Sequence, residues 1–248
     1  RLWGRGVDAA RFRPDQRDDQ WRAQAAPGRA VIGYVGRLAP EKQVADLASL
    51  ARMPGTQLVI VGDGPSRAGL ERELPGALFT GHLSGNNLAR VMASFDVCVH
   101  PGESETFGQT IQEALASGVP VVATGVGGPV DLVRSSIDGW LYRPGDVQEM
   151  RDRVRDLIGD EAKRRAFSLA AREGVKGRTW DALCTALVER YDEARVLRPI
   201  DDALQARAAQ RPDTPPQRTT SGTAAPSHRP WNTYVALGDS VTEGLCDT

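Results

Sequence analysis

The sequence is short of cysteine, of long apolar runs and of net charge, and each shortage argues against a class of protein. Its three cysteines, Cys98, Cys184 and Cys246, are odd in number and far apart. They indicate neither a disulfide framework nor a cysteine-rich zinc site, so a cytoplasmic location is expected. No apolar run approaches the length of a membrane span. A formal net charge of −1 argues against nucleic acid as a partner, because such binding needs many uncompensated cations on one face.

The sequence also lacks a typical metal-binding triplet and an initial methionine. No Asp-x-Asp triplet occurs in the chain, which argues against a metal ion bridging a diphosphate, so we expect no metal and no cofactor. The chain begins at Arg1 without a methionine or a signal peptide, and we expect it to be a piece of a longer protein. Its 248 residues, 40% of them hydrophobic, suffice for one large or two small folded domains.

Short apolar segments alternate with amphipathic segments along most of the sequence. Strands are predicted at residues 31–35, 57–61, 77–80, 97–99, 120–123 and 137–142. Helices are predicted at residues 44–52, 66–73, 86–94, 107–117, 147–158, 161–173 and 179–196. Strands that alternate with helices predict an α/β fold with a Rossmann-like, doubly wound parallel sheet of about six strands.

Residues 100–122 read as a strand end, a loop, a helix and the next strand. A helix that starts at Phe107 would point four backbone N–H groups at an anion, those of Phe107, Gly108, Gln109 and Thr110. Gly108 lacks a Cβ where the anion would approach, and Glu105 and Glu113 flank the place with acceptors for sugar hydroxyls. These residues predict a phosphate that carries sugars as the ligand.

A strand-to-helix loop carries two cations near the start of the predicted sheet. Residues 36–42 follow the strand at 31–35 and include Arg37 and Lys42. Open α/β sheets bind ligands at the carboxyl ends of their strands, where this loop lies. Arginine presents a planar fork and lysine a point charge, so both are suited to a diphosphate. The alternative is a pair of solvated surface cations.

The motifs in these two regions resemble those of a known family. Glu105 and Glu113, with Gly118 and Pro120 in register, resemble the E-x7-E signature of family-4 retaining glycosyltransferases. Residues 36–42 resemble the family's G-R-L-x-x-E-K pattern, and residues 62–65 its G-D-G-P turn, for which we expect a role in backbone geometry. Asp131 stands where the family usually has Glu. The alternative for the two glutamates is an acidic loop before an ordinary amphipathic helix.

The resemblance covers residues 1–197 and implies the C-terminal, donor-binding domain of a GT-B fold, whose N-terminal domain is missing from this sequence. It implies catalytic roles for Arg37, Lys42 and Glu105, and donor-binding roles for Gly36, Phe107, Gly108, Gln109, Thr110 and Glu113. Within the family, the sequence looks most like GDP-mannose-dependent α-mannosyltransferases that act on lipid or glycolipid acceptors. A nucleotide-diphosphate sugar is then the partner, and a lipid acceptor would place the protein at the cytoplasmic membrane face.

The composition changes after residue 197. Residues 198–230 gain Pro, Thr, Ser, Arg and Ala and lose periodic apolar positions, which predicts a flexible, disordered linker. Residues 231–248 then hold an apolar strand followed by Gly238-Asp239-Ser240. This block resembles the start of an SGNH, or GDSL-type, hydrolase, which implies Ser240 as a nucleophile. Because the sequence lacks a partner base for that serine, we expect no ester hydrolysis by this fragment. The alternative is a tail with an accidental match.

The implied reaction is the transfer of a hexose with retention of its anomeric configuration, and we expect the fragment alone to be inactive. Two other classes of function stay open. One is a non-catalytic module that binds a nucleotide sugar. The other is the front part of a bifunctional transferase and SGNH esterase.

Overall fold

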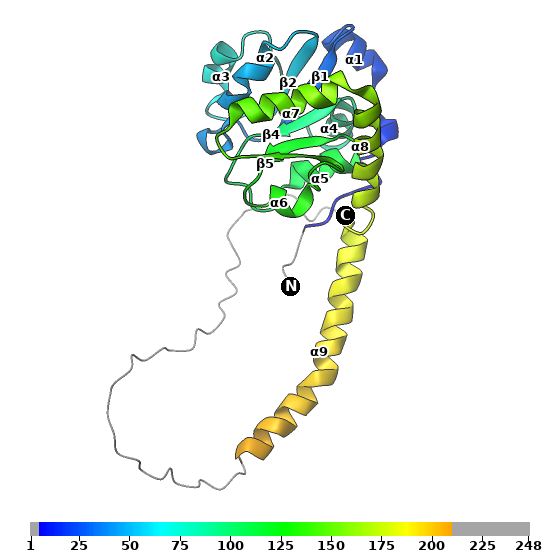
Figure 1. The fold of residues 1–248 in the computed structure, drawn as a ribbon. Coiled ribbons are helices and arrows are strands. Elements are labelled where there is room, and N and C mark those ends of the chain that lie inside the picture. Colours follow the sequence, from blue (N-terminus) through cyan, green and yellow to red (C-terminus); the bar gives the residue numbers. More distant parts are fainter. Residues whose placement is uncertain (1–4, 210–248) are drawn as a thin grey trace, which may run out of the picture. The chain divides into compact units, whose positions relative to one another are not determined.

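The computed structural model describes the backbone of residues 5–209 and the side chains of residues 5–195. Within that range, six strands form one parallel sheet in the order β3-β2-β1-β4-β5-β6. The order reverses between β1 and β4, as in doubly wound sheets that bind dinucleotides. Helices lie on both faces of this sheet (Figure 1). The predicted fold class is therefore confirmed.

The elements follow the predicted order, and most helix and strand ends differ from the predicted ones by a few residues. The strands are β1 (Ala30–Val35), β2 (Thr56–Val61), β3 (Leu78–Gly81), β4 (Val97–His100), β5 (Val121–Thr124) and β6 (Gly139–Tyr142). The α-helices are α1 (Asp19–Ala25), α2 (Ala48–Ala51), α3 (Arg67–Glu73), α4 (Gly85–Ala93), α5 (Gln109–Ala116), α6 (Pro129–Leu132), α7 (Val147–Gly159), α8 (Glu161–Gly174) and α9 (Trp180–Ala209). Three 3₁₀ turns complete the set: η1 (Pro14–Gln16), η2 (Pro40–Lys42) and η3 (Val44–Leu47).

The two faces of the sheet bury two apolar clusters, and side chains alternate between them along each strand. On β1, Val31 and Val35 belong to the cluster under α4 and α5, whereas Ile32 and Tyr34 belong to the cluster under α2, α3 and α7. Figure 1 shows α7 across one face of the sheet, with α4 and α5 on the other. The sheet is thus covered on both faces, so ligands have access to it only at its edges and strand ends.

The helix predicted at residues 44–52 is present, and it is built from two short segments. Gln43 adopts a left-handed conformation with φ 50°, which interrupts the helical path directly after η2. The chain then makes the 3₁₀ turn η3 before the single turn of α2. Residues 44–51 are therefore helical, and only their second half is α-helix.

The last helix, α9, is longer than predicted. It was expected to end at residue 196 and continues to Ala209, so the segment expected to be a linker starts as helix. Residues 200–209 are rich in Ala, Leu, Arg and Gln, which favour helix. The remainder of that linker, the block at 231–248 and Ser240 lie outside the described residues. None of the described helices combines the length and the hydropathy that a bilayer crossing requires.

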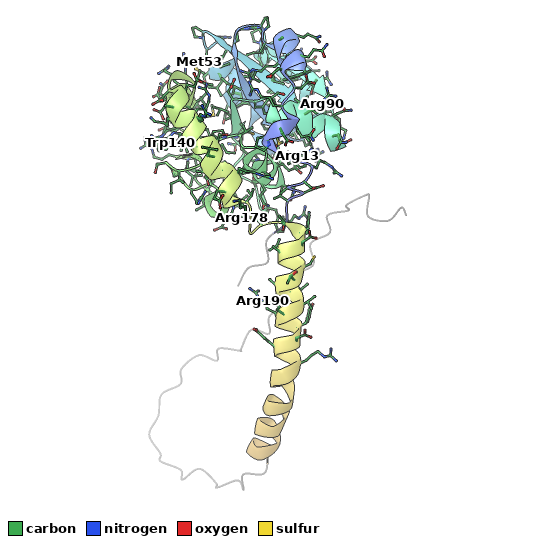
Figure 2. The ribbon with its side chains drawn as sticks, turned by 90° about the vertical axis from the view of Figure 1, so that its right-hand side faces the viewer. Arg13, Met53, Arg90, Trp140, Arg178 and Arg190 are labelled. Carbon is green, nitrogen blue, oxygen red and sulfur yellow. The ribbon has the colours of Figure 1, made fainter. Side chains whose placement is uncertain are left out.

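Hydrogen bonds hold the start of α9 against the sheet domain. Val7 forms an isolated parallel bridge with Thr179, and its N–H donates to the Arg178 carbonyl at 2.9 Å. The Arg178 guanidinium in turn donates to the carbonyls of Leu132 at 3.1 Å and Asp131 at 3.3 Å. Figure 2 labels Arg178 where α9 begins. The N-terminal arm therefore pairs with the chain just before its last helix.

Candidate functional site

The candidate site lies at the carboxyl ends of β1 and β4, where the strand order reverses. The loop after β1 carries Lys42 and the loop after β4 carries Glu105. Lys42 Nζ donates to Glu105 Oε2 at 2.9 Å, and the two side chains are 23% and 18% exposed. Such reversal points are where open α/β sheets bind ligands. The fold therefore joins two charged residues that the sequence places in separate motifs.

The Glu105 carboxylate is bonded at both of its oxygens. Oε1 accepts from the backbone N–H of Gly108 at 2.8 Å and of Phe107 at 3.3 Å. Oε2 contacts Lys42 and also His100 Nε2, at 3.4 Å. Hydrogen bonding by His100, then by Lys42 and the Gly108 N–H, holds the pKa of Glu105 far below its ordinary value, although burial acts in the opposite direction. The carboxylate is therefore ionised at neutral pH and binds two of the amides that were predicted to hold a phosphate.

The helix after Glu105 begins two residues later than predicted. Gly108 is the N-cap of α5, with φ 57°, and the helix itself begins at Gln109. The predicted start at Phe107 is wrong because the left-handed Gly108 directs the first two amides to Glu105. A Cβ on Gly108 would lie 2.4 Å from Leu132 Cδ1. The glycine is thus required by backbone conformation and by packing on α6, whereas the sequence had suggested the approach of a ligand.

His100 is the last residue of β4 and is 5% exposed. Its Nε2 faces Glu105, while its Nδ1 is buried and has no hydrogen-bond partner among the described residues. The sequence places this histidine beside the site and leaves a supporting role for it open. Its position at the carboxyl end of a strand next to the reversal point was the available signal.

A glutamine that the sequence analysis passes over ties the two loops together. Gln43 Oε1 accepts from the Glu103 N–H at 2.8 Å, and Gln43 Nε2 donates to Glu103 Oε1 at 3.4 Å. On the same loop as Glu103, a Cβ added to Gly102 would lie 3.3 Å from Lys42 Cα. These contacts hold the backbone of Lys42 against the loop that carries Glu105. Only its place next to Lys42 could have indicated Gln43 from sequence.

Two glycine-rich turns support the site through their backbones. In the turn after β2, a Cβ on Gly62 would lie 1.9 Å from the Gly36 carbonyl oxygen. In the turn after β5, a Cβ on Gly128 would lie 2.6 Å from the Thr106 carbonyl oxygen, and the Gly128 N–H donates to the Glu105 carbonyl at 2.7 Å. The G-D-G-P turn therefore has the geometric role predicted for it, and the turn after β5 has a similar one.

Glu113 lies in the second turn of α5 and is only partly exposed. Burial raises its pKa to about 7, a rise opposed by the Gln109 amide and by the charge of Arg11. The Gln109 contact is long, with Nε2 3.5 Å from Glu113 Oε1. Glu113 is therefore a carboxyl that carries a proton for part of the time at neutral pH, in contrast to Glu105.

Arg37 and Phe107 are exposed members of the predicted site. The Arg37 side chain is 67% exposed, and its Nη1 lies 3.9 Å from Glu41 Oε1. Phe107 is 43% exposed, with the Arg5 guanidinium 4.6 Å from its ring centre. Within the described residues, neither side chain has a hydrogen bond or ion pair to the Lys42–Glu105 pair. The structure thus joins Lys42, but not the Arg37 side chain, to the start of α5.

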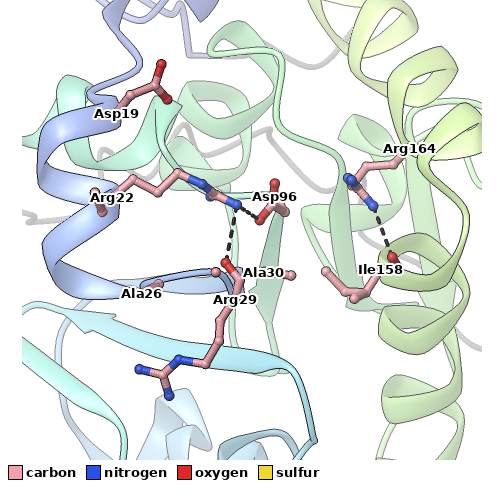
Figure 3. A pocket seen from close by; sticks show the side chains of 10 residues that line it. Asp19, Arg22, Ala26, Arg29, Ala30, Asp96, Ile158 and Arg164 are labelled. Carbon is pink, nitrogen blue, oxygen red and sulfur yellow. Dashed lines mark hydrogen bonds and ion pairs between the residues drawn. The ribbon is translucent and has the colours of Figure 1, made fainter.

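A separate cavity lies at the amino ends of the strands. Figure 3 shows it beside α1, with Arg22 directed at Asp96. Asp96 accepts from Arg22 and from the Val31 N–H at 2.7 Å, while Arg164 donates to the Ile158 carbonyl at 3.1 Å. These charged groups are bonded within the protein, at the edge of the sheet opposite to the candidate site. The bonds of Arg22, Asp96 and Arg164 therefore hold the segments around this cavity together.

Comparison with known proteins identifies the family. The sequence profile described as "Glycosyl transferases group 1" matches residues 15–174. The chain belongs to this family. The match contains β1, β4 and α5, so it includes both loops of the candidate site.

Two relatives of this group 1 chain carry the name GDP-mannose-dependent alpha-mannosyltransferase. The protein of Mycolicibacterium smegmatis is 50% identical over 192 residues, which cover 77% of this chain and 50% of that protein. The protein of Corynebacterium glutamicum is 46% identical over 197 residues, which cover 79% of this chain and 48% of that protein. The chain therefore spans about half the length of these curated relatives.

A solved structure of a related protein agrees with this assignment. Anabaena Alr3699/HepE, crystallised in complex with UDP and glucose, superimposes with a TM-score of 0.68 at 25% sequence identity. The superposition covers 75% of this chain and 55% of that one. The group 1 chain thus has a GT-B-like α/β fold, and the matched region again amounts to about half of its relative.

Proposed function

We propose that this group 1 chain is the donor-binding part of a transferase that moves a hexose with retention, namely mannose from GDP-mannose, to a lipid or glycan acceptor. The observation that carries the proposal is the Lys42–Glu105 pair at the reversal point of the sheet. The choice of GDP-mannose is supported by 46% and 50% identity to two proteins named for that donor.

In the proposed reaction, the bond between the sugar and the diphosphate breaks and negative charge grows on the departing diphosphate. Lys42 and Arg37 supply positive charge to that group, and the amides of the first turn of α5 add hydrogen-bond donors. Loss of one donor of this kind typically costs about 3 kcal/mol of transition-state stabilisation. Glu105 then accepts from hydroxyls of the transferred sugar, and Glu113 from hydroxyls of the ribose.

The proposed site works without a metal ion or cofactor. Two cations on one loop, Arg37 and Lys42, would take the place of a metal at the diphosphate. Calorimetric titration with GDP-mannose in the presence and absence of EDTA tests this part. We expect the same Kd under both conditions, and a large loss of affinity with EDTA would contradict it.

The same titration decides the donor. We expect GDP-mannose to bind more tightly than UDP-glucose or UDP-N-acetylglucosamine. Tighter binding of UDP-glucose would select the second candidate donor, which the likeness to HepE favours. If a sample that circular dichroism shows to be folded binds none of the three, the proposed function is wrong.

Transfer itself is a property of the whole protein. An assay with a mannolipid acceptor, followed by NMR of the product's anomeric proton, tests both transfer and retention. We expect an α-linked product. A protein that binds the donor and never transfers it would instead be a nucleotide-sugar-binding module.

A further inference from the structure

The four hydrogen-bond donors around Glu105 pose a problem for sugar binding. An ionised carboxylate has about four acceptor sites. The amides of Phe107 and Gly108 use those of Oε1, and Lys42 and His100 use those of Oε2. A sugar hydroxyl can therefore donate to this carboxylate only if one of the four donors leaves.

Lys42 is the donor that a diphosphate removes. The two amides belong to the backbone that leads into α5 and are fixed by Gly108 and its packing. His100 closes a buried strand and is 5% exposed. Lys42, in contrast, reaches Glu105 from another loop on a flexible four-carbon stem and is 23% exposed. When phosphate oxygens take its ammonium group, Oε2 of Glu105 keeps His100 as its single partner.

The surroundings of His100 indicate which of its ring nitrogens carries the proton. Its Nδ1 is buried without a partner among the described residues. A buried N–H without an acceptor costs more than an unused lone pair, so a proton on Nε2 is favoured over one on Nδ1. A proton on Nε2 faces Oε2 of Glu105, which lies 3.4 Å from that nitrogen.

On the basis of the proposed function, we propose that His100 is a positioning residue. Its Nε2–H holds the Glu105 carboxylate towards the donor's sugar after the diphosphate has taken Lys42 away. His100 thus acts through Glu105 and touches neither the sugar nor the phosphate. Binding of the diphosphate and recognition of the sugar become coupled through one carboxylate oxygen.

A matched pair of amide substitutions tests this role. In His100→Gln the side-chain amide reaches the place of Nε2, whereas in His100→Asn it stops near the place of Nδ1. Both variants keep a polar amide in the same buried site, and only the first can donate to Glu105. Calorimetry on the purified chain then compares GDP-mannose with GDP, or UDP-glucose with UDP if that donor is selected.

We expect His100→Asn to raise the Kd of the nucleotide sugar about tenfold, the usual effect of losing a charge-assisted hydrogen bond. Its Kd for the free nucleotide should stay within about twofold, and His100→Gln should resemble the wild type for both ligands. Equal effects of the two substitutions, or equal weakening of both ligands by His100→Asn, would overturn the positioning role. If the wild type binds neither ligand, the proposed function fails and this inference falls with it.

A second measurement is made on the wild type and uses a variant only to assign the signals. Imidazole ¹⁵N NMR of the wild type reports which nitrogen of His100 carries the proton, and the signals lost in His100→Gln assign that residue among the three histidines. We expect a proton on Nε2. A proton on Nδ1 would leave no donor for Glu105 and would refute the proposal.

Discussion

Glu113 is a carboxyl that the fold disfavours in its ionised form. Burial raises its pKa from an ordinary 4.5 to about 7, and its one hydrogen bond within the described part of the chain, from Gln109, is long at 3.5 Å. The stability that the protonated form contributes is full below pH 4.5 and is lost as the pH rises through about 7. Wild-type stability should therefore fall between these pH values on account of this residue.

The size of the fall follows from the pKa change. One pKa unit corresponds to about 1.4 kcal/mol, so the rise at Glu113 corresponds to roughly 3 kcal/mol of lost stability when the side chain is ionised. Glu113→Gln keeps the shape of the protonated form and cannot ionise. We expect this variant to match the wild type near pH 4.5 and to exceed it by about 3 kcal/mol at pH 8.

Urea denaturation at pH 5 and pH 8 measures both differences. Glu105→Gln is the matched control, because its ionised form is stabilised by His100, Lys42 and the Gly108 amide. Glu105→Gln should lower the free energy of unfolding by roughly 2 kcal/mol at pH 8. The two substitutions should therefore change stability in opposite directions at that pH. A Glu113→Gln variant that is less stable than the wild type at pH 8, or shows the same difference at both pH values, would mean that the fold does not disfavour the ionised form of Glu113.

Two more substitutions test the loops. Lys42→Met keeps the apolar stem and should raise the Kd of GDP about tenfold, while the Kd of guanosine stays within about twofold. Lys176→Met, which removes a lysine from an exposed ion pair, is the control. An equal loss of affinity for GDP and guanosine would mean that Lys42 does not hold the diphosphate. Gly128→Ala should lower the free energy of unfolding, measured with urea, by about 1–3 kcal/mol and should weaken GDP binding. The reason is that the added Cβ would lie 2.6 Å from the Thr106 carbonyl oxygen. Gly159→Ala, with open space around the added Cβ, should leave stability nearly unchanged, and equal effects of the two alanines would refute the tight packing at Gly128.

The sequence could predict the fold because the physics involved is local and periodic. Apolar runs such as Val97–Val99 mark strands covered on both faces, and helical patterns between them require parallel crossovers. The expected starts of α7 and α8 are also confirmed, where Asp146 and Asp160 accept from first-turn amides. The family motifs contain Lys42 and Glu105, which the structure brings together at the carboxyl ends of β1 and β4.

The sequence could not predict what the loops do with their own polar groups. Two backbone amides before α5 were predicted to bind a phosphate, but both donate hydrogen bonds to the carboxylate of Glu105. A side chain and a ligand compete for the same donors there, and spacing alone does not say which one wins. The contacts of Gln43 and His100 were missed for a related reason, because both depend on how two loops meet.

The charge balance of the site explains why two cations are needed on one loop. Lys42 and Glu105 neutralise each other at 2.9 Å, so this pair alone offers an approaching diphosphate no net attraction. Arg37 lies on the same loop, and its exposed pair with Glu41 at 3.9 Å is of a kind worth at most about 1 kcal/mol. Arg37 is therefore the cation that can turn to the diphosphate at little cost. In the proposed reaction, the diphosphate draws Lys42 from Glu105, which frees the carboxylate for the sugar only after the phosphates are in place.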